Sequence, residues 1–75
     1  MDMHAIVALL DDVQTTHFET GEPVVLSRGE AGTVVMLYGD GTCEVEFADR
    51  SGRTYALLPL PVDRLLLLHG VTELG

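Results

Sequence analysis

The sequence predicts an all-β fold built from about five short antiparallel strands, with a 3₁₀ turn before the last strand. The apolar segments of this 75-residue chain are short, and none continues to helix length. Several are rich in β-branched and aromatic residues, and glycine, proline and aspartate mark the turns between them. A chain of this length holds one small domain. We expect it to span residues 1–75, with a core over about 5–68 and a tail over 69–75.

The first strand is expected over residues 5–10, where a short apolar run is ended by Asp11 and Asp12. A polar loop containing several glycines follows over residues 11–32. The Val-Val-Leu sequence at residues 24–26 interrupts this loop and predicts a short extended segment.

The clearest element is a hairpin whose turn is formed by Asp-Gly at residues 40–41, a dipeptide typical of type I′ turns. Residues 43–47 follow this turn and alternate between apolar and acidic side chains. The side that faces the core is therefore expected to hold Cys43, Val45 and Phe47.

A two-residue turn also fixes the pairing of this strand with residues 33–38. The predicted inward-facing pairs are Val34 with Phe47, Met36 with Val45, and Tyr38 with Cys43. The same register turns Val35 and Leu37 outward, beside Glu44 and Glu46. A three-residue loop would shift the register and reverse this assignment.

A second turn is expected over residues 48–52 and a strand over 53–58, which ends because Pro59 and Pro61 cannot donate a ladder hydrogen bond. Residues 61–64 suit one 3₁₀ turn, and residues 65–68 form the last strand. This succession describes a small SH3-like barrel. A five-stranded OB-like barrel is the alternative, but it needs a helix for which the chain has no room.

The charge balance excludes several kinds of partner. Twelve Asp and Glu residues stand against four Arg and no Lys, which gives a net charge of −8. Because binding to phosphates needs clustered cations, we expect neither nucleic acid nor a membrane surface as a partner. The start of the chain lacks the cations of a signal peptide, and no apolar run reaches the ~20 residues that span a bilayer. We therefore expect a cytoplasmic protein.

Residue types that serve catalysis or metal binding form no recognisable pattern. The single cysteine, Cys43, lies on the core side of its strand, where a free cysteine behaves as a small inert hydrophobe. The three histidines, His4, His17 and His69, have no second His or Cys at ligand spacing. We expect a protein that is not an enzyme, with no catalytic residue, no cofactor and no metal site.

Three motifs carry a family resemblance. Gly29 to Val35 reads G-x-x-G-T-V-V, residues 44–47 read E-V-E-F, and residues 56–60 read A-L-L-P-L. With these motifs, over roughly residues 6–68, the chain resembles a family of short stand-alone bacterial proteins classed only as a domain of unknown function. More loosely, it resembles SH3-like accessory subunits of photosynthetic and redox complexes, and residues 32–35 resemble the KOW motif of ribosomal and transcription-elongation proteins. The resemblance implies the barrel fold and protein docking, and it transfers no catalytic residue.

These observations predict a non-enzymatic protein–protein interaction module whose surface combines acidic and apolar side chains. An antitoxin or immunity protein that masks a basic toxin is the most specific version, an accessory subunit is another, and a KOW-like RNA- or ribosome-associated module is the alternative. Apolar surface left outside the core also predicts a homodimer. A weak divalent-ion site is an alternative use of the acidic loop. The predicted partner-binding residues are Asp11, Asp12, Glu19, Glu22, Val35, Leu37, Glu44, Glu46, Leu66 and Leu68.

Overall fold

The structure of the chain, a computed structural model, describes residues 1–69. Within them it contains β1 (Ile6–Leu9), β2 (Val13–Thr16), β3 (Pro23–Leu26), β4 (Ala31–Leu37), β5 (Thr42–Ala48), β6 (Thr54–Pro61), the 3₁₀ helix η1 (Val62–Arg64) and β7 (Leu65–His69). The predicted all-β class and the 3₁₀ turn before the last strand are confirmed. No helix in the described part of the chain is long and apolar enough to cross a membrane. The predicted tail lies outside the described residues except for His69, which ends β7.

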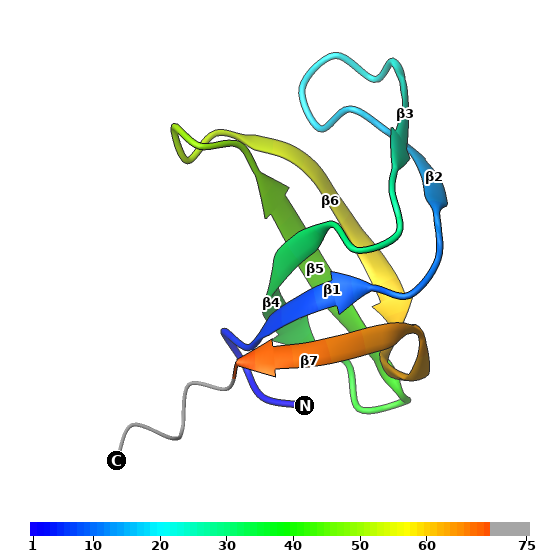
Figure 1. Ribbon diagram of the computed structural model, residues 1–75, viewed down its shortest axis with the longest axis vertical. Helices are drawn as coiled ribbons and strands as arrows, with labels where there is room; N and C mark the ends of the chain where they lie inside the picture. Colours follow the sequence, from blue (N-terminus) through cyan, green and yellow to red (C-terminus); the bar gives the residue numbers. More distant parts are fainter. Residues whose placement is uncertain (70–75) are drawn as a thin grey trace.

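Five strands form one antiparallel sheet in the order β6-β5-β4-β1-β7, and β2 and β3 form a separate hairpin. The sheet curls, so that β1 and β7 cross in front of β5 and β6 (Figure 1). A hydrogen bond of 2.9 Å from the Phe18 N–H to the Tyr55 carbonyl holds the hairpin against β6. β6 and β7 are consecutive strands in the chain and are joined by η1, yet they lie at opposite edges of the sheet.

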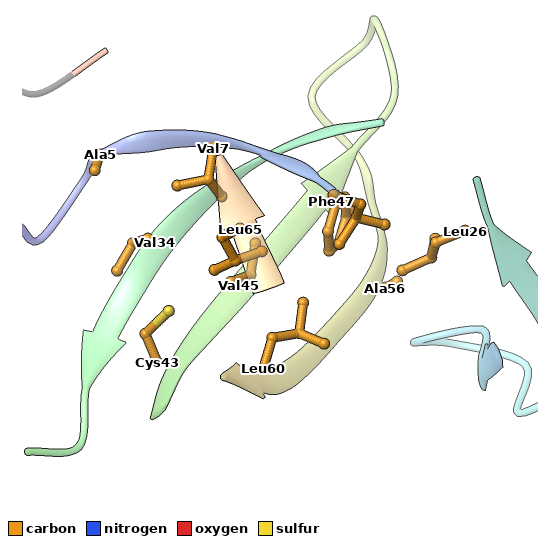
Figure 2. Close-up of a cluster of buried hydrophobic side chains, with 11 residues drawn as sticks. Ala5, Val7, Leu26, Val34, Cys43, Val45, Phe47, Ala56, Leu60 and Leu65 are labelled. Carbon is orange, nitrogen blue, oxygen red and sulfur yellow. The ribbon is translucent and has the colours of Figure 1, made fainter. Parts of the chain in front are cut away.

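The core fills the space that the curled sheet encloses. Figure 2 shows its side chains converging from the five strands of the sheet, with Leu26 added from β3. The predicted core side of β5 is confirmed, because Cys43, Val45 and Phe47 have no exposed surface. Phe47 is the largest of the fully buried side chains among the described residues.

Gly32 in β4 is a glycine because its neighbours leave no space for a side chain. A Cβ atom at this position would lie 2.7 Å from Val45 Cγ1 and 2.9 Å from both the Glu46 carbonyl oxygen and Phe47 Cε2. A Cβ atom essentially never makes contacts this short, so a larger residue would push β4 away from β5. Gly32 thus permits the close approach of the two strands over the Phe47 ring.

The hairpin between β4 and β5 forms where the sequence predicts it, but its turn is one residue longer. The Tyr38 N–H donates to the Thr42 carbonyl across 3.1 Å and closes a loop of three residues. Positive φ angles occur at Gly39 and Gly41 and not at Asp40, so the predicted type I′ turn is wrong. The Asp40 carboxylate instead accepts a hydrogen bond from the Thr42 N–H (3.0 Å).

The longer loop changes the pairing of the two strands. The observed register pairs Val34 with Val45 and Leu37 with Cys43 and shifts at Val35 between them, so the three predicted pairs are wrong. Val34 is buried as predicted. The residues predicted to face inward that are instead exposed are Met36 and Tyr38.

β6 continues through the two prolines that were predicted to end it. Pro59 lies opposite Glu44 of β5, and Pro61 lies opposite Thr42. β6 is an edge strand, and proline is tolerated at an edge because the N–H that it lacks would point away from the neighbouring strand.

The large sheet contains all five predicted strands, and β2 with β3 brings the total among residues 1–69 to seven. β3 was predicted as an extended segment, whereas β2 was not predicted. β2 pairs with β3 from Val13 opposite Leu26 to Thr16 opposite Pro23.

The second predicted turn is confirmed between β5 and β6. Asp49 Oδ1 accepts hydrogen bonds from the Ser51 hydroxyl (2.7 Å), the Ser51 N–H (2.9 Å) and the Arg53 N–H (3.0 Å). These bonds favour the ionised carboxylate, so they hold the pKa of Asp49 below its ordinary value, with the Ser51 hydroxyl contributing most.

Candidate functional site

A hollow of about 180 Å³ lies where the β1–β2 connection meets the end of β6 and η1. Its apolar lining comes from Leu9, Val13, Leu60 and Pro61. Leu9 and Leu60 also belong to the core and are only 3% and 7% exposed, so the hollow extends down to the edge of the core. Sites for small molecules usually have at least about 300 Å³. This hollow therefore suits one or two side chains of a partner.

Charged side chains form the rim of the hollow. Arg64 Nε donates to Asp11 Oδ2 across 2.8 Å, and Arg64 Nη2 contacts the same oxygen. Both side chains are about half exposed, so this ion pair contributes little to stability. Asp12 Oδ1 accepts a hydrogen bond from the Arg28 N–H (2.8 Å). Within residues 1–69, Asp12 forms no ion pair. Of the charges on this rim, that of Asp12 is therefore the one that no cation cancels.

Glu19 and Glu22 lie in the loop that joins β2 to β3, so the length of β2 separates them from the hollow. Glu19 forms an ion pair with Arg53, with 2.8 Å between Glu19 Oε1 and Arg53 Nη2. The predicted acidic residues are thus distributed over the molecule and do not form one acidic face.

Glu44 and Glu46 lie on the outer side of β5, as predicted, but hydroxyl groups of the chain already bind both carboxylates. The Tyr38 hydroxyl donates to Glu44 Oε1 (2.6 Å), and the Thr54 hydroxyl donates to Glu46 Oε2. The first bond raises the pKa of Tyr38, because the carboxylate accepts from the protonated hydroxyl. Neither glutamate therefore presents an unengaged carboxylate.

Val35 and Leu37 do not lie opposite these two glutamates, because the register places Met36 and Thr33 there. Val35 is half-buried at the bulge. Leu37 is 39% exposed near the hairpin turn. The predicted apolar pair beside the glutamates is therefore not formed.

Leu66 and Leu68 of β7 are accessible, together with Leu67 between them. These three side chains are 51–52% exposed, whereas Leu65 is 7% exposed. β7 pairs with β1 on one side, and no strand among residues 1–69 pairs with its other side. This strand is separate from the hollow and forms a second apolar surface.

The described part of the chain contains no group of three or more His, Cys, Asp or Glu side chains that could hold a metal ion. Cys43 is free and has no exposed surface, and burial raises the pKa of its thiol. A raised thiol pKa lowers the fraction of thiolate, which is the reactive form.

Sequence reasoning found Asp11 and Asp12 but missed the rest of the hollow. Leu9 and Leu60 belong to the core, and no local pattern in the sequence shows that they also line a hollow. Arg64 lies 53 positions from Asp11 in the chain. The opposite charges of these two side chains were the one signal in the sequence that could have linked them.

A curled five-stranded sheet, an attached hairpin and a shallow hollow define a small all-β domain with a surface site. A family model described as a domain of unknown function (DUF4926) matches residues 3–67, and the chain belongs to this family. The predicted resemblance to a family of unknown function is thereby confirmed. No curated protein and no solved structure matches the chain.

Proposed function

We propose that the domain is a non-enzymatic protein-binding module and that the hollow beside η1 is its docking site. The observation that carries this proposal is the composition of the hollow, where an apolar lining that includes core side chains lies next to the uncancelled charge of Asp12. An apolar centre contributes affinity when a partner excludes water from it, and charge at the rim speeds encounter.

The chain connectivity supports an SH3-like barrel as the scaffold of this module. The last strand lies beside the first in the sheet, the β2–β3 hairpin is inserted after the first strand, and η1 precedes the last. Protein docking is the commonest use of such barrels, as the sequence resemblance implies.

The partner that fits the hollow is a protein that presents a basic side chain next to an apolar one. The net charge of −8 attracts basic proteins over a distance. Arg64 is already paired with Asp11, so a basic group of the partner would bind Asp12. A basic toxin that the domain masks in the cytoplasm is the most specific version of this partner, and a larger complex that uses the domain as an accessory subunit is another.

The experiment is affinity capture from the native host with the full-length chain, followed by mass spectrometry and by affinity measurement with the captured protein. Asp12→Asn keeps an oxygen for the Arg28 N–H and removes the charge at the hollow. Glu22→Gln removes the same charge in the β2–β3 loop and is the matched control. We expect a basic protein to bind wild type and Glu22→Gln equally, and Asp12→Asn about tenfold more weakly, or ~1.4 kcal/mol.

An equal loss in both variants would show that only net charge matters and that the hollow is not the site. Capture of RNA alone would favour the KOW-like alternative. A mobility shift assay at low salt decides this, because that alternative requires a shift at concentrations of tens of micromolar.

A further inference from the structure

We infer that the free edge of β7 is a second interaction surface, through which two copies of this chain pair antiparallel into one continuous sheet. This inference is independent of the hollow and its partner. It rests on the backbone geometry of β7, on the different chemistry of the two sheet edges, and on the absence of charge along β7.

The pairing of β7 with β1 shows which backbone groups face the open edge. The Leu10 N–H donates to the Arg64 carbonyl (3.2 Å), and the register is constant from there to Leu67 opposite Val7. Along an antiparallel strand, successive residues direct their N–H and C=O groups alternately toward the neighbouring strand and away from it. Arg64 and Leu66 therefore point toward β1. Leu67 directs its N–H and C=O groups, and Leu65 its C=O group, to the open edge, whereas the Leu65 N–H donates to the Val62 carbonyl of η1.

The opposite edge of the sheet cannot accept a strand in the same way. Pro59 and Pro61 have no N–H to donate along β6. Further along β6, the Tyr55 carbonyl already accepts the Phe18 N–H of the β2–β3 loop. Pairing between copies therefore uses β7 on both chains, which is the symmetric arrangement of a two-fold dimer.

The side chains of β7 fit a second copy better than a basic partner. The strand reads Leu-Leu-Leu-Leu-His and contains no Asp, Glu, Lys or Arg. The charge next to it, on Arg64, is cancelled by Asp11. Two chains of net charge −8 repel least where they meet along an uncharged strand. Antiparallel pairing near Leu67 places leucine opposite leucine and removes apolar surface of both copies from water.

The test is sedimentation equilibrium of the full-length chain from micromolar to millimolar concentration, at about 0.15 M and about 0.5 M salt. We expect a monomer–dimer equilibrium that salt shifts toward the dimer, because it screens the repulsion between the chains. Leu66→Glu and Leu66→Lys should each weaken dimerisation at least about tenfold, because like charges then lie close together across the two-fold axis. The lysine variant lowers the net negative charge, so a loss there cannot come from overall repulsion.

Leu57→Glu on β6 is the matched control, since Leu57 is also exposed and lies at the other edge of the sheet. It should dimerise like wild type. Thermal unfolding followed by circular dichroism verifies that each variant is folded. Amide hydrogen exchange gives a readout without substitution, because the Leu67 N–H should become protected as the dimer forms, whereas the Leu65 N–H already donates to the Val62 carbonyl in the single chain.

Three results would overturn the inference. One is a monomer at every concentration and salt. Another is equal weakening by Leu57→Glu and Leu66→Glu, which would place the contact elsewhere. The third is protection of the Leu67 amide in a monomer, which would show that another part of the same chain covers the edge.

Discussion

At the scale of single residues, Gly32 has no room for even a methyl group. Gly32→Ala should destabilise the protein by about 1–3 kcal/mol, because the new Cβ would overlap the Glu46 carbonyl, which cannot rotate away, and the Phe47 ring. Urea unfolding measures this cost. Gly29→Ala is the comparison, since nothing lies within 4 Å of its Cβ and only its positive φ of 88° is strained. Gly32→Ala alone should alter the aromatic signals of Phe47, and an unchanged spectrum would contradict the close packing.

Burial was easier to predict from the sequence than pairing. The inward side chains of β5 alternate with glutamates, and a strand has only two faces, so Cys43, Val45 and Phe47 could be assigned correctly. The hairpin register depends on which residues of the turn take a positive φ. Gly39 and Gly41, which flank Asp40, both take a positive φ, and local turn preference does not predict this.

At the scale of elements, Tyr55 connects β6 to the turn between β3 and β4. Its hydroxyl donates to Glu30 Oε2, and Glu30 Oε1 accepts the Ser27 N–H (2.9 Å). Burial, together with the hydrogen bond to Glu30, raises the pKa of Tyr55 to about 12. The folded state thus favours the protonated hydroxyl, whereas an unfolded tyrosine has a pKa of about 10.

The stabilisation due to Tyr55 should be complete below about pH 10 and should be lost as the pH rises from about 10 toward 12. Tyr55→Phe should be less stable than wild type at neutral pH, by ~1 kcal/mol for a lost hydrogen bond, and should lose this part of the alkaline dependence. Urea unfolding between about pH 8 and 11 measures both effects. Tyr38→Phe, which changes an exposed tyrosine, should keep the part due to Tyr55. Parallel wild-type and Tyr55→Phe profiles would contradict the proposed linkage.

The five strands of the large sheet were predictable from their sequence, β5 by its alternation of apolar and acidic residues and the other four as short apolar or β-branched runs between turn residues. β2 has a single apolar residue, Val13, in four positions, so it becomes a strand through its pairing with β3. The end of β6 was wrongly predicted because proline is tolerated in an edge strand where its missing N–H would point outward, and position in the sheet is a tertiary property. The hollow depends on the same tertiary information, since it joins residues from both ends of the chain.

At the scale of the whole molecule, the core is small enough for one side chain to decide folding. Phe47→Ala should cost ~3–5 kcal/mol, which is comparable to the net stability of ~3–5 kcal/mol that a core of this size provides. We expect this variant to be largely unfolded at about 37 °C, as measured by thermal circular dichroism. Phe18→Ala is the control, because Phe18 is 55% exposed, and it should unfold near the wild-type temperature. A melting curve like that of wild type for Phe47→Ala would contradict the central role of this ring.

In the dimer that we propose, the prolines of β6 would also limit further assembly. A sheet with two receptive edges can add chains without limit and grow into a fibre. Here Pro59 and Pro61 remove two donors of one edge, and the Phe18 N–H occupies the Tyr55 carbonyl on the same side. When two chains join through β7, both outer borders of the joined sheet are β6 strands. Pairing through β7 would therefore favour a finite particle over a growing fibre.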